Sequence, residues 1–188
     1  MQNDQPKKIN FMKKGILLSL IFIIAMTVNI GCDALDVVEE ITFDIEMTAQ
    51  SDVAAYAAEY LLMADSLSSE IEEYSNLIKK IELIEVTFQI VSVGAGNEAL
   101  KINSATLNVA AEDGTGQQNV ATVTDQDIAV MLAPVALPLN QAGMDRFAEL
   151  IKASPHHAII LMAGTADSAP VDFTIKFFFK IKMTANPL

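Results

Sequence analysis

The stretch Phe173-Thr-Ile-Lys-Phe-Phe-Phe-Lys-Ile-Lys-Met183 decides the fold of this chain. Apolar side chains stand at every second position, with threonine or lysine between them and Phe178 as the exception. Successive side chains of a β-strand point to opposite faces of its sheet, so this alternation predicts a strand with one buried side and one solvent-facing side. We therefore expect the core to be built from β-sheet.

Other segments repeat this pattern in shorter form. We expect further strands over residues 41–48, 84–90, 104–111, 120–124, 128–132 and 157–162. Pro134 and Pro138 predict an edge strand or a loop in the part of the chain that holds them.

Helical signals are few. Ser69 followed by Glu72 is typical of a capping box and predicts a short helix over residues 69–80. Asn140 is expected to cap a second helix that ends near Ile151. The alanine-rich residues 52–67 favour a helix by propensity, although an irregular crossing is the alternative.

Strands separated by polar turns, without a repeating strand–helix–strand unit, predict a fold class that is mainly β. Our first expectation is an antiparallel β-sandwich, immunoglobulin-like, with one or two short helices. The alternative is a curved sheet with helices packed on one side.

Composition narrows the classes of function. The chain has 188 residues, of which 52% are hydrophobic, and 24 acidic side chains against 12 basic ones give a net charge of -12. The apolar content is too high for a disordered chain, and the negative charge argues against nucleic acid as a partner. A single cysteine excludes an internal disulfide framework and a thiolate zinc cluster.

The first 31 residues have the pattern of a signal peptide. Lys13 and Lys14 precede an apolar run from Gly15 to Val28, which is shorter than the roughly 20 residues a membrane-spanning helix needs. Because Met12 opens this pattern, it is a candidate for the true start, with Met1 to Phe11 as an upstream extension.

The run ends at Val28-Asn-Ile-Gly-Cys32, which resembles the lipobox of bacterial lipoproteins. The resemblance is carried by Gly31 and Cys32 and covers the leader only, while Asn29 departs from the aliphatic residue usual at that place. It implies that Cys32 becomes a lipidated N-terminus after cleavage. The alternative is that Cys32 is a small apolar residue of an uncleaved leader.

These features predict three segments: a signal peptide at 1–31, a lipidated cysteine with an acidic tether at 32–40, and a single β-sandwich domain at 41–188. After Cys32 the chain keeps 8 basic and 23 acidic side chains, a net charge of -15. The acidic residues behind Cys32 are interpreted as a solvated tether, with a sorting signal as the alternative.

Few residues suggest chemistry. His156 and His157 are adjacent and would point to opposite faces of a strand, so we do not expect them to share a metal. Calcium is a weaker hypothesis: Glu112 and Asp113 flank one turn, Asp125 and Asp127 follow close by, and two acidic loops at one end of a sandwich could supply oxygen ligands. No catalytic residue and no cofactor are expected.

The lysines of the last strand have two interpretations. If that strand pairs with residues 41–48, Asp44 and Glu46 would form ion pairs with it and set the register. The alternative is that Lys176, Lys180 and Lys182 form a basic stripe for an anionic partner. Phe178, which points outward among them, would mark a contact surface or be covered by a helix.

The sequence therefore predicts a non-enzymatic, lipid-anchored protein of the bacterial cell envelope, at the outer membrane rather than the inner one. Its domain would serve binding, adhesion or structural interaction, with a protein, a glycan or an apolar ligand as the unknown partner. The alternative is a periplasmic carrier of a lipid or another apolar ligand, for which abundant methionine and aliphatic residues would line a cavity. A hydrolase is a third and weaker hypothesis.

Overall fold

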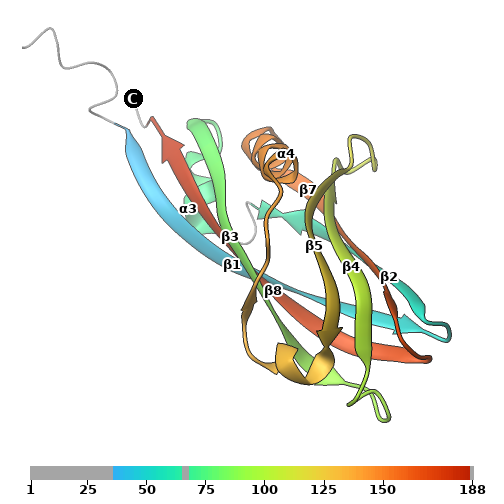
Figure 1. Ribbon diagram of the computed structural model, residues 1–188. Helices are drawn as coiled ribbons and strands as arrows, with labels where there is room; N and C mark the ends of the chain where they lie inside the picture. The colour runs from blue at the N-terminus through green and yellow to red at the C-terminus, as the bar shows by residue number, and fades with distance from the viewer. Residues whose placement is uncertain (1–35, 65–67, 187–188) are drawn as a thin grey trace, which may run out of the picture. The chain divides into compact units, whose positions relative to one another are not determined.

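Two four-stranded antiparallel sheets pack face to face in the computed structural model, which describes residues 36–64 and 68–186 (Figure 1). The first sheet has the order β1-β8-β3-β6. Its strands are β1 (Val37–Ser51), β8 (Val171–Ala185), β3 (Ile78–Val93) and the short β6 (Val135–Ala136). The second sheet has the order β2-β7-β4-β5. Its strands are β2 (Ala55–Met63), β7 (His157–Ala166), β4 (Lys101–Ala110) and β5 (Gln118–Asp127).

This architecture confirms the predicted class, a mainly β antiparallel sandwich with two helices. The strand order differs from the immunoglobulin-like arrangement that we expected. An immunoglobulin sandwich pairs strands in the order A-B-E-D and C-F-G. Here successive strands switch sheets except at the β4–β5 hairpin, and the first strand lies beside the last and the second beside the seventh, which is the order of an eight-stranded jelly roll.

The strand that decided the prediction is central to the first sheet. β8 pairs on one side with β1 over its whole length, from Val37 opposite Ala185 to Ser51 opposite Val171, and on the other side with β3. Its odd-numbered side chains are buried, as the alternation predicted. β1 begins at Val37 rather than residue 41, so Glu39 and Glu40 belong to the sheet and not to a tether.

Three other local predictions were wrong. Residues 55–63 form β2 instead of a helix, because pairing with β7 outweighs the high helix propensity of alanine. Residues 128–132 form the short 3-10 helix η2 (Ile128–Leu132), which buries Ile128 and Met131. The helix α3 (Ser69–Tyr74) is shorter than expected and is capped by Ser68, whose hydroxyl accepts a hydrogen bond from the Ile71 amide.

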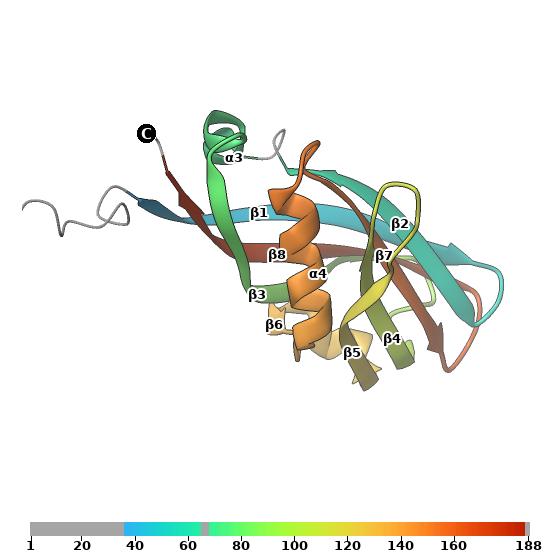
Figure 2. The same cartoon turned by 90° about the horizontal axis from the view of Figure 1, so that it is seen from above.

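The helix α4 (Gln141–Lys152) begins where Asn140 predicted it, since the Asn140 side chain accepts a hydrogen bond of 2.9 Å from the Ala142 amide. Figure 2 shows α4 between β3 and β5. Phe147 of this helix stacks on Phe179 of β8 at 5.6 Å, and Phe43 of β1 stacks on Phe179 at 5.4 Å. The helix therefore closes the core between the two sheets.

The predicted signal peptide, the Met12 start and Cys32 lie outside the described residues. Among the residues that are described, no helix is long and apolar enough to cross a membrane.

Candidate binding surface

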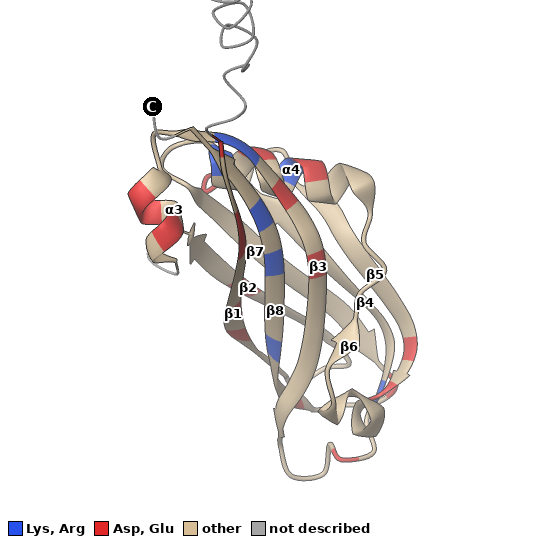
Figure 3. Ribbon diagram, turned by 90° about the vertical axis from the view of Figure 1, so that its left-hand side faces the viewer, with Lys and Arg blue, Asp and Glu red and all other residues tan. Residues whose placement is uncertain are grey.

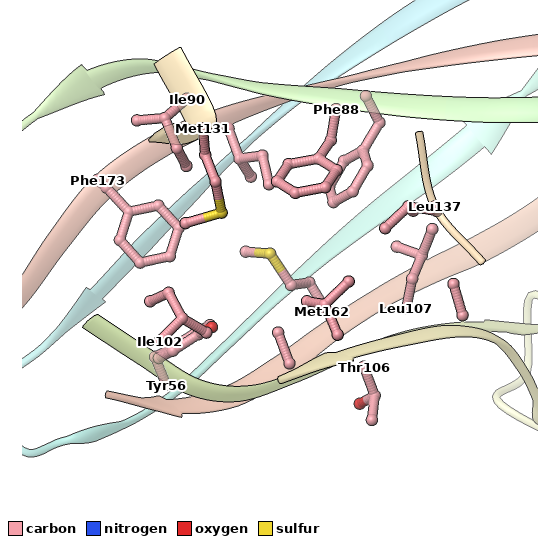
Figure 4. Close-up of a pocket in the computed structure, with 15 residues that line it drawn as sticks. Tyr56, Phe88, Ile90, Ile102, Thr106, Leu107, Met131, Leu137, Met162 and Phe173 are labelled. Atoms are coloured by element: carbon pink, nitrogen blue, oxygen red, sulfur yellow. The ribbon is translucent and has the colours of Figure 1, made fainter. Parts of the chain in front are cut away.

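The interior of the sandwich holds one candidate site, an apolar cavity of about 40 Å³ (Figure 4). Met131 of η2 and Met162 of β7 point toward each other across it. Its wall includes Tyr56, which packs edge-on against Phe173 at 5.3 Å. Burial raises the pKa of the Tyr56 hydroxyl to about 12.

The size of this cavity decides what it can hold. Pockets for drug-sized ligands enclose roughly 300–1,000 Å³, whereas one water needs only about 10–15 Å³ of such space. An almost wholly apolar space of this size is a small packing defect rather than a ligand pocket. It does not favour the lipid-carrier alternative.

The four calcium candidates are not brought together. Glu112 and Asp113 lie in the turn that joins β4 to β5, whereas Asp125 and Asp127 lie at the opposite end of that hairpin, where Asp127 is opposite Lys101. The expectation that two acidic loops share one end was wrong, because both belong to one hairpin. Among the described residues, no group of three or more His, Cys, Asp and Glu side chains could hold a metal ion.

Asp113 has a structural role in its turn. Its Oδ1 accepts hydrogen bonds from the hydroxyl of Thr115 at 2.7 Å and from the Thr115 amide at 2.9 Å. These bonds hold the pKa of the Asp113 carboxyl below its ordinary value, with the hydroxyl as the largest cause. The carboxylate therefore stabilises the loop that it occupies.

The two histidines point apart, as expected of neighbours at the start of a strand. His156 is buried, and its Nδ1 lies 2.8 Å from the Ile151 carbonyl oxygen at the end of α4. His157 is half-buried on the outside of β7, where its Nδ1 lies 3.4 Å from Glu112. They do not form a shared ligand pair.

The outer face of the first sheet carries the lysine stripe, which we call the charged face. Figure 3 shows lysine positions along β8 between acidic positions on the neighbouring strands. Lys176 Nζ lies 3.0 Å from Asp44 and 3.3 Å from Glu46, and Lys180 Nζ lies 2.7 Å from Glu40. The predicted pairing of β1 with β8 and its cross-strand ion pairs are confirmed.

These ion pairs alter the charge that the face presents. Hydrogen bonding to Asp44 raises the pKa of Lys176, and hydrogen bonding to Lys180 lowers the pKa of Glu40. Phe178 lies beneath Lys176, with Nζ 5.8 Å from the ring centroid. The stripe is thus neutralised by its own sheet, which favours the structural interpretation over a basic site for an anion.

The outer face of the second sheet has the opposite character, and we call it the neutral face. It consists of the outward side chains of four strands, in which cross-strand partners lie on the same side. These are Ala55, Ala57, Glu59, Leu61 and Met63 of β2, His157, Ile159, Leu161, Ala163 and Thr165 of β7, Ser104, Thr106 and Asn108 of β4, and Asn119, Thr122 and Thr124 of β5. Glu59 is the one carboxylate among them, and the ends of the face carry charge as well: Lys101 lies opposite Asp127, and Glu112 lies 3.4 Å from His157.

The neutral face has an apolar half and a polar half. On the apolar half Leu61 lies opposite Ile159, with Leu61 40% exposed, and Met63 is 42% exposed. On the polar half the side chains bond to one another or to the sheet. The hydroxyls of Ser104 and Thr165 are 3.2 Å apart, and the Asn119 amide donates to Asn108 at 3.2 Å.

A hollow of about 320 Å³ lies beside this apolar half. Its wall includes Ala57, Glu59, Leu161 and Ala163 of the neutral face, together with Asn108 and Gln117. The small side chains Ala57 and Ala163 lie opposite each other in the register and create the depression. Leu61 and Met63 project next to it, so the face carries both a projection and a recess.

The neutral face was not predicted from sequence. Residues 55–63 are apolar on both sides of β2, so no alternation marks them as a strand. The signal that could have found the face is the run of uncharged residues with alternating serine and threonine in β4 and β5, which is unusual in so acidic a chain.

Neither a protein-family model nor a curated protein matches the chain. Solved structures of viral proteins resemble it distantly. Desmodium yellow mottle tymovirus is 15% identical, with 81% of this chain and 84% of that chain covered and a TM-score of 0.35. Turnip yellow mosaic virus is 11% identical, with 81% and 95% covered and a TM-score of 0.37. The BFDV capsid protein is 6% identical, with 79% and 98% covered and a TM-score of 0.40.

Proposed function

We propose that this chain is a lipid-anchored protein of the bacterial cell envelope whose β-sandwich is a non-catalytic interaction domain. The anchor rests on the position of Cys32, the sole cysteine, directly after an apolar run and Gly31. One observation carries the interaction role: a broad sheet face whose middle has a single carboxylate, with its other charges paired at the ends, on a chain whose net charge is -12.

The physical reason is the cost of dehydration. Charged side chains are strongly hydrated, and removing that water opposes binding unless each charge finds a partner. The polar half of the neutral face is already hydrogen-bonded within the sheet, and its apolar half gains from being covered. Of the two outer faces, the neutral face therefore loses less hydration free energy when a partner covers it.

Metabolic labelling with a palmitate analogue tests the anchor. We expect the wild-type chain to carry the label and to be found in the membrane fraction. Cys32→Ala should carry no label and should not be found in that fraction. Label retained by Cys32→Ala would show that the lipid is attached elsewhere or that the anchor is wrong.

The carrier alternative is tested on the same Cys32→Ala chain, which has no anchoring lipid to confuse the result. Mass spectrometry of its organic extract would detect a lipid held inside the sandwich. We expect none, because the cavity encloses about 40 Å³. A stoichiometric lipid in that extract would favour the carrier.

A further inference from the structure

We propose that the neutral face is the contact surface between two copies of this chain, which associate by stacking these faces around a two-fold axis. This inference rests on the proposed interaction role and names its partner. Three observations carry it: the charge pattern, the paired projection and recess, and the area.

The charge pattern of the neutral face restricts which partners can bind it. A basic partner would be drawn to the acidic surface, but the middle of the neutral face offers it only Glu59. The charges at the ends of the face have partners already, because Asp127 lies opposite Lys101 and Glu112 lies 3.4 Å from His157. A partner that matches the neutral face must itself present an uncharged surface. The chain carries one, and stacking the two keeps the acidic residues of each copy outside the contact.

The face carries both a projection and an open recess. In a two-fold contact the same surface meets its own copy and every contact is reciprocal, so a projection that meets the recess of the other copy does so twice. Leu61 and Met63 project at 40% and 42% exposure, and the hollow of about 320 Å³ lies along the same strand at Ala57 and Glu59. Leu61 of one copy can thus occupy the hollow of the other.

The area is sufficient for a specific contact. Four strands spaced about 4.8 Å apart and nine residues rising about 3.3 Å each cover roughly 570 Å² per copy, or about 1,100 Å² in total. A specific interface needs about 1,000 Å². Sheets pack face to face in the same way inside the sandwich, with apolar side chains between them.

Other partners fit this face less well. A nucleic acid or an anionic membrane surface is bound through lysine and arginine side chains, and among the strands of this face the only one is Lys101, which lies opposite Asp127. The described outward side chains of the face include no aromatic ring on which a sugar could stack. If the anchor holds both copies in one membrane, it also raises their local concentration.

The test is light scattering of the full chain in detergent, with the protein mass separated from the micelle mass, from nanomolar to high-micromolar concentration. We expect the mass to rise to twice that of one chain. Leu61→Glu should weaken dimerisation at least tenfold, because it places a carboxylate in the hollow. Ile84→Glu is the matched control, since Ile84 is 45% exposed on β3 of the other sheet and should leave the dimer intact.

Three results would overturn the proposal. They are a monomeric wild type throughout the range, a dimer that Leu61→Glu leaves unchanged, and equal loss in both variants while both remain folded by circular dichroism. Salt gives an independent check: since the contact brings two acidic copies together and has few charges of its own, screening should strengthen the dimer, whereas weakening would point to the charged face. A chain that is labelled with palmitate yet monomeric would contradict this inference without contradicting the proposed lipid anchor.

Discussion

Replacing Phe179 with alanine should produce a large loss of stability, and the same change at its neighbour Phe178 should not. Phe179 is fully buried and lies between two aromatic rings, Phe43 at 5.4 Å and Phe147 at 5.6 Å. Removing a buried phenylalanine typically destabilises a core by about 3–5 kcal/mol. For a domain of this size that corresponds to a fall in melting temperature of roughly 6–20 °C.

Phe178 is the matched control because it occupies the same strand and points to the other side. Its ring lies under Lys176 at 5.8 Å on the charged face. Phe178 is half-buried, so Phe178→Ala should lose a cation–π contact of about 0.5–1 kcal/mol and part of the about 1.5–3 kcal/mol that full burial of a phenylalanine contributes, which stays below the loss at Phe179. The two variants differ by one position and test which face of β8 holds the core.

The unfolding of both variants by urea is measured in the full chain. Far-ultraviolet circular dichroism monitors it, since the sequence has no tryptophan for fluorescence. A second comparison adds Phe147→Ala to Phe179→Ala. If α4 docks on β8 as described, the two losses should be less than additive, because each removes part of the same stack. Equal destabilisation by Phe178→Ala and Phe179→Ala would refute the register of β8.

Three smaller predictions concern titration and packing. Tyr56→Phe should remove a fall in stability at high pH, because burial raises the folded pKa of Tyr56 to about 12 from 10.0. The stabilisation from the neutral hydroxyl is complete below pH 10 and is lost as the pH rises through about 12, and an ultraviolet absorbance titration would follow the ionisation. Glu40→Gln should remove a stabilisation with the opposite pH dependence, because Lys180 lowers the pKa of Glu40 below 4.5. The urea midpoint of the variant should therefore differ from that of the wild type above pH 4.5, and the difference should vanish as the pH falls below that value. Gly143→Ala should destabilise the domain by about 1–3 kcal/mol in thermal unfolding, since the added methyl would overlap the Asn119 carbonyl oxygen; a gain would show that α4 has room to move.

The parts of the fold that the sequence predicted are those with a local signal. β8 alternates between apolar and polar residues except at Phe178, β1 does so over residues 41–50, and Asn140 marks the first turn of α4. The ion pairs of Lys176 with Asp44 and Glu46 were expected only on the condition that β1 pairs with β8, which the structure shows.

The parts that failed depend on residues distant in sequence. β2 is apolar on both faces, because Tyr56 and Leu62 enter the core while Leu61 and Met63 belong to the neutral face. The pattern of the apolar run at 128–132 fits a strand and a helix equally well. In the described part of the chain no strand pairs with this run, and it forms η2. Strand order could not be read from any one segment, and the neutral face exists only because that order brings β2, β7, β4 and β5 side by side.

Photo-cross-linking in membrane vesicles tests the central claim most directly, that the two outer faces of the sandwich have different roles. A photoreactive side chain is placed at Ala57 of the neutral face or at Thr42, which lies opposite Lys180 on the charged face, in the purified full chain. We predict an adduct of twice the chain mass from Ala57 and none from Thr42. Adducts from Thr42 alone, or equal yields from both positions, would contradict the account.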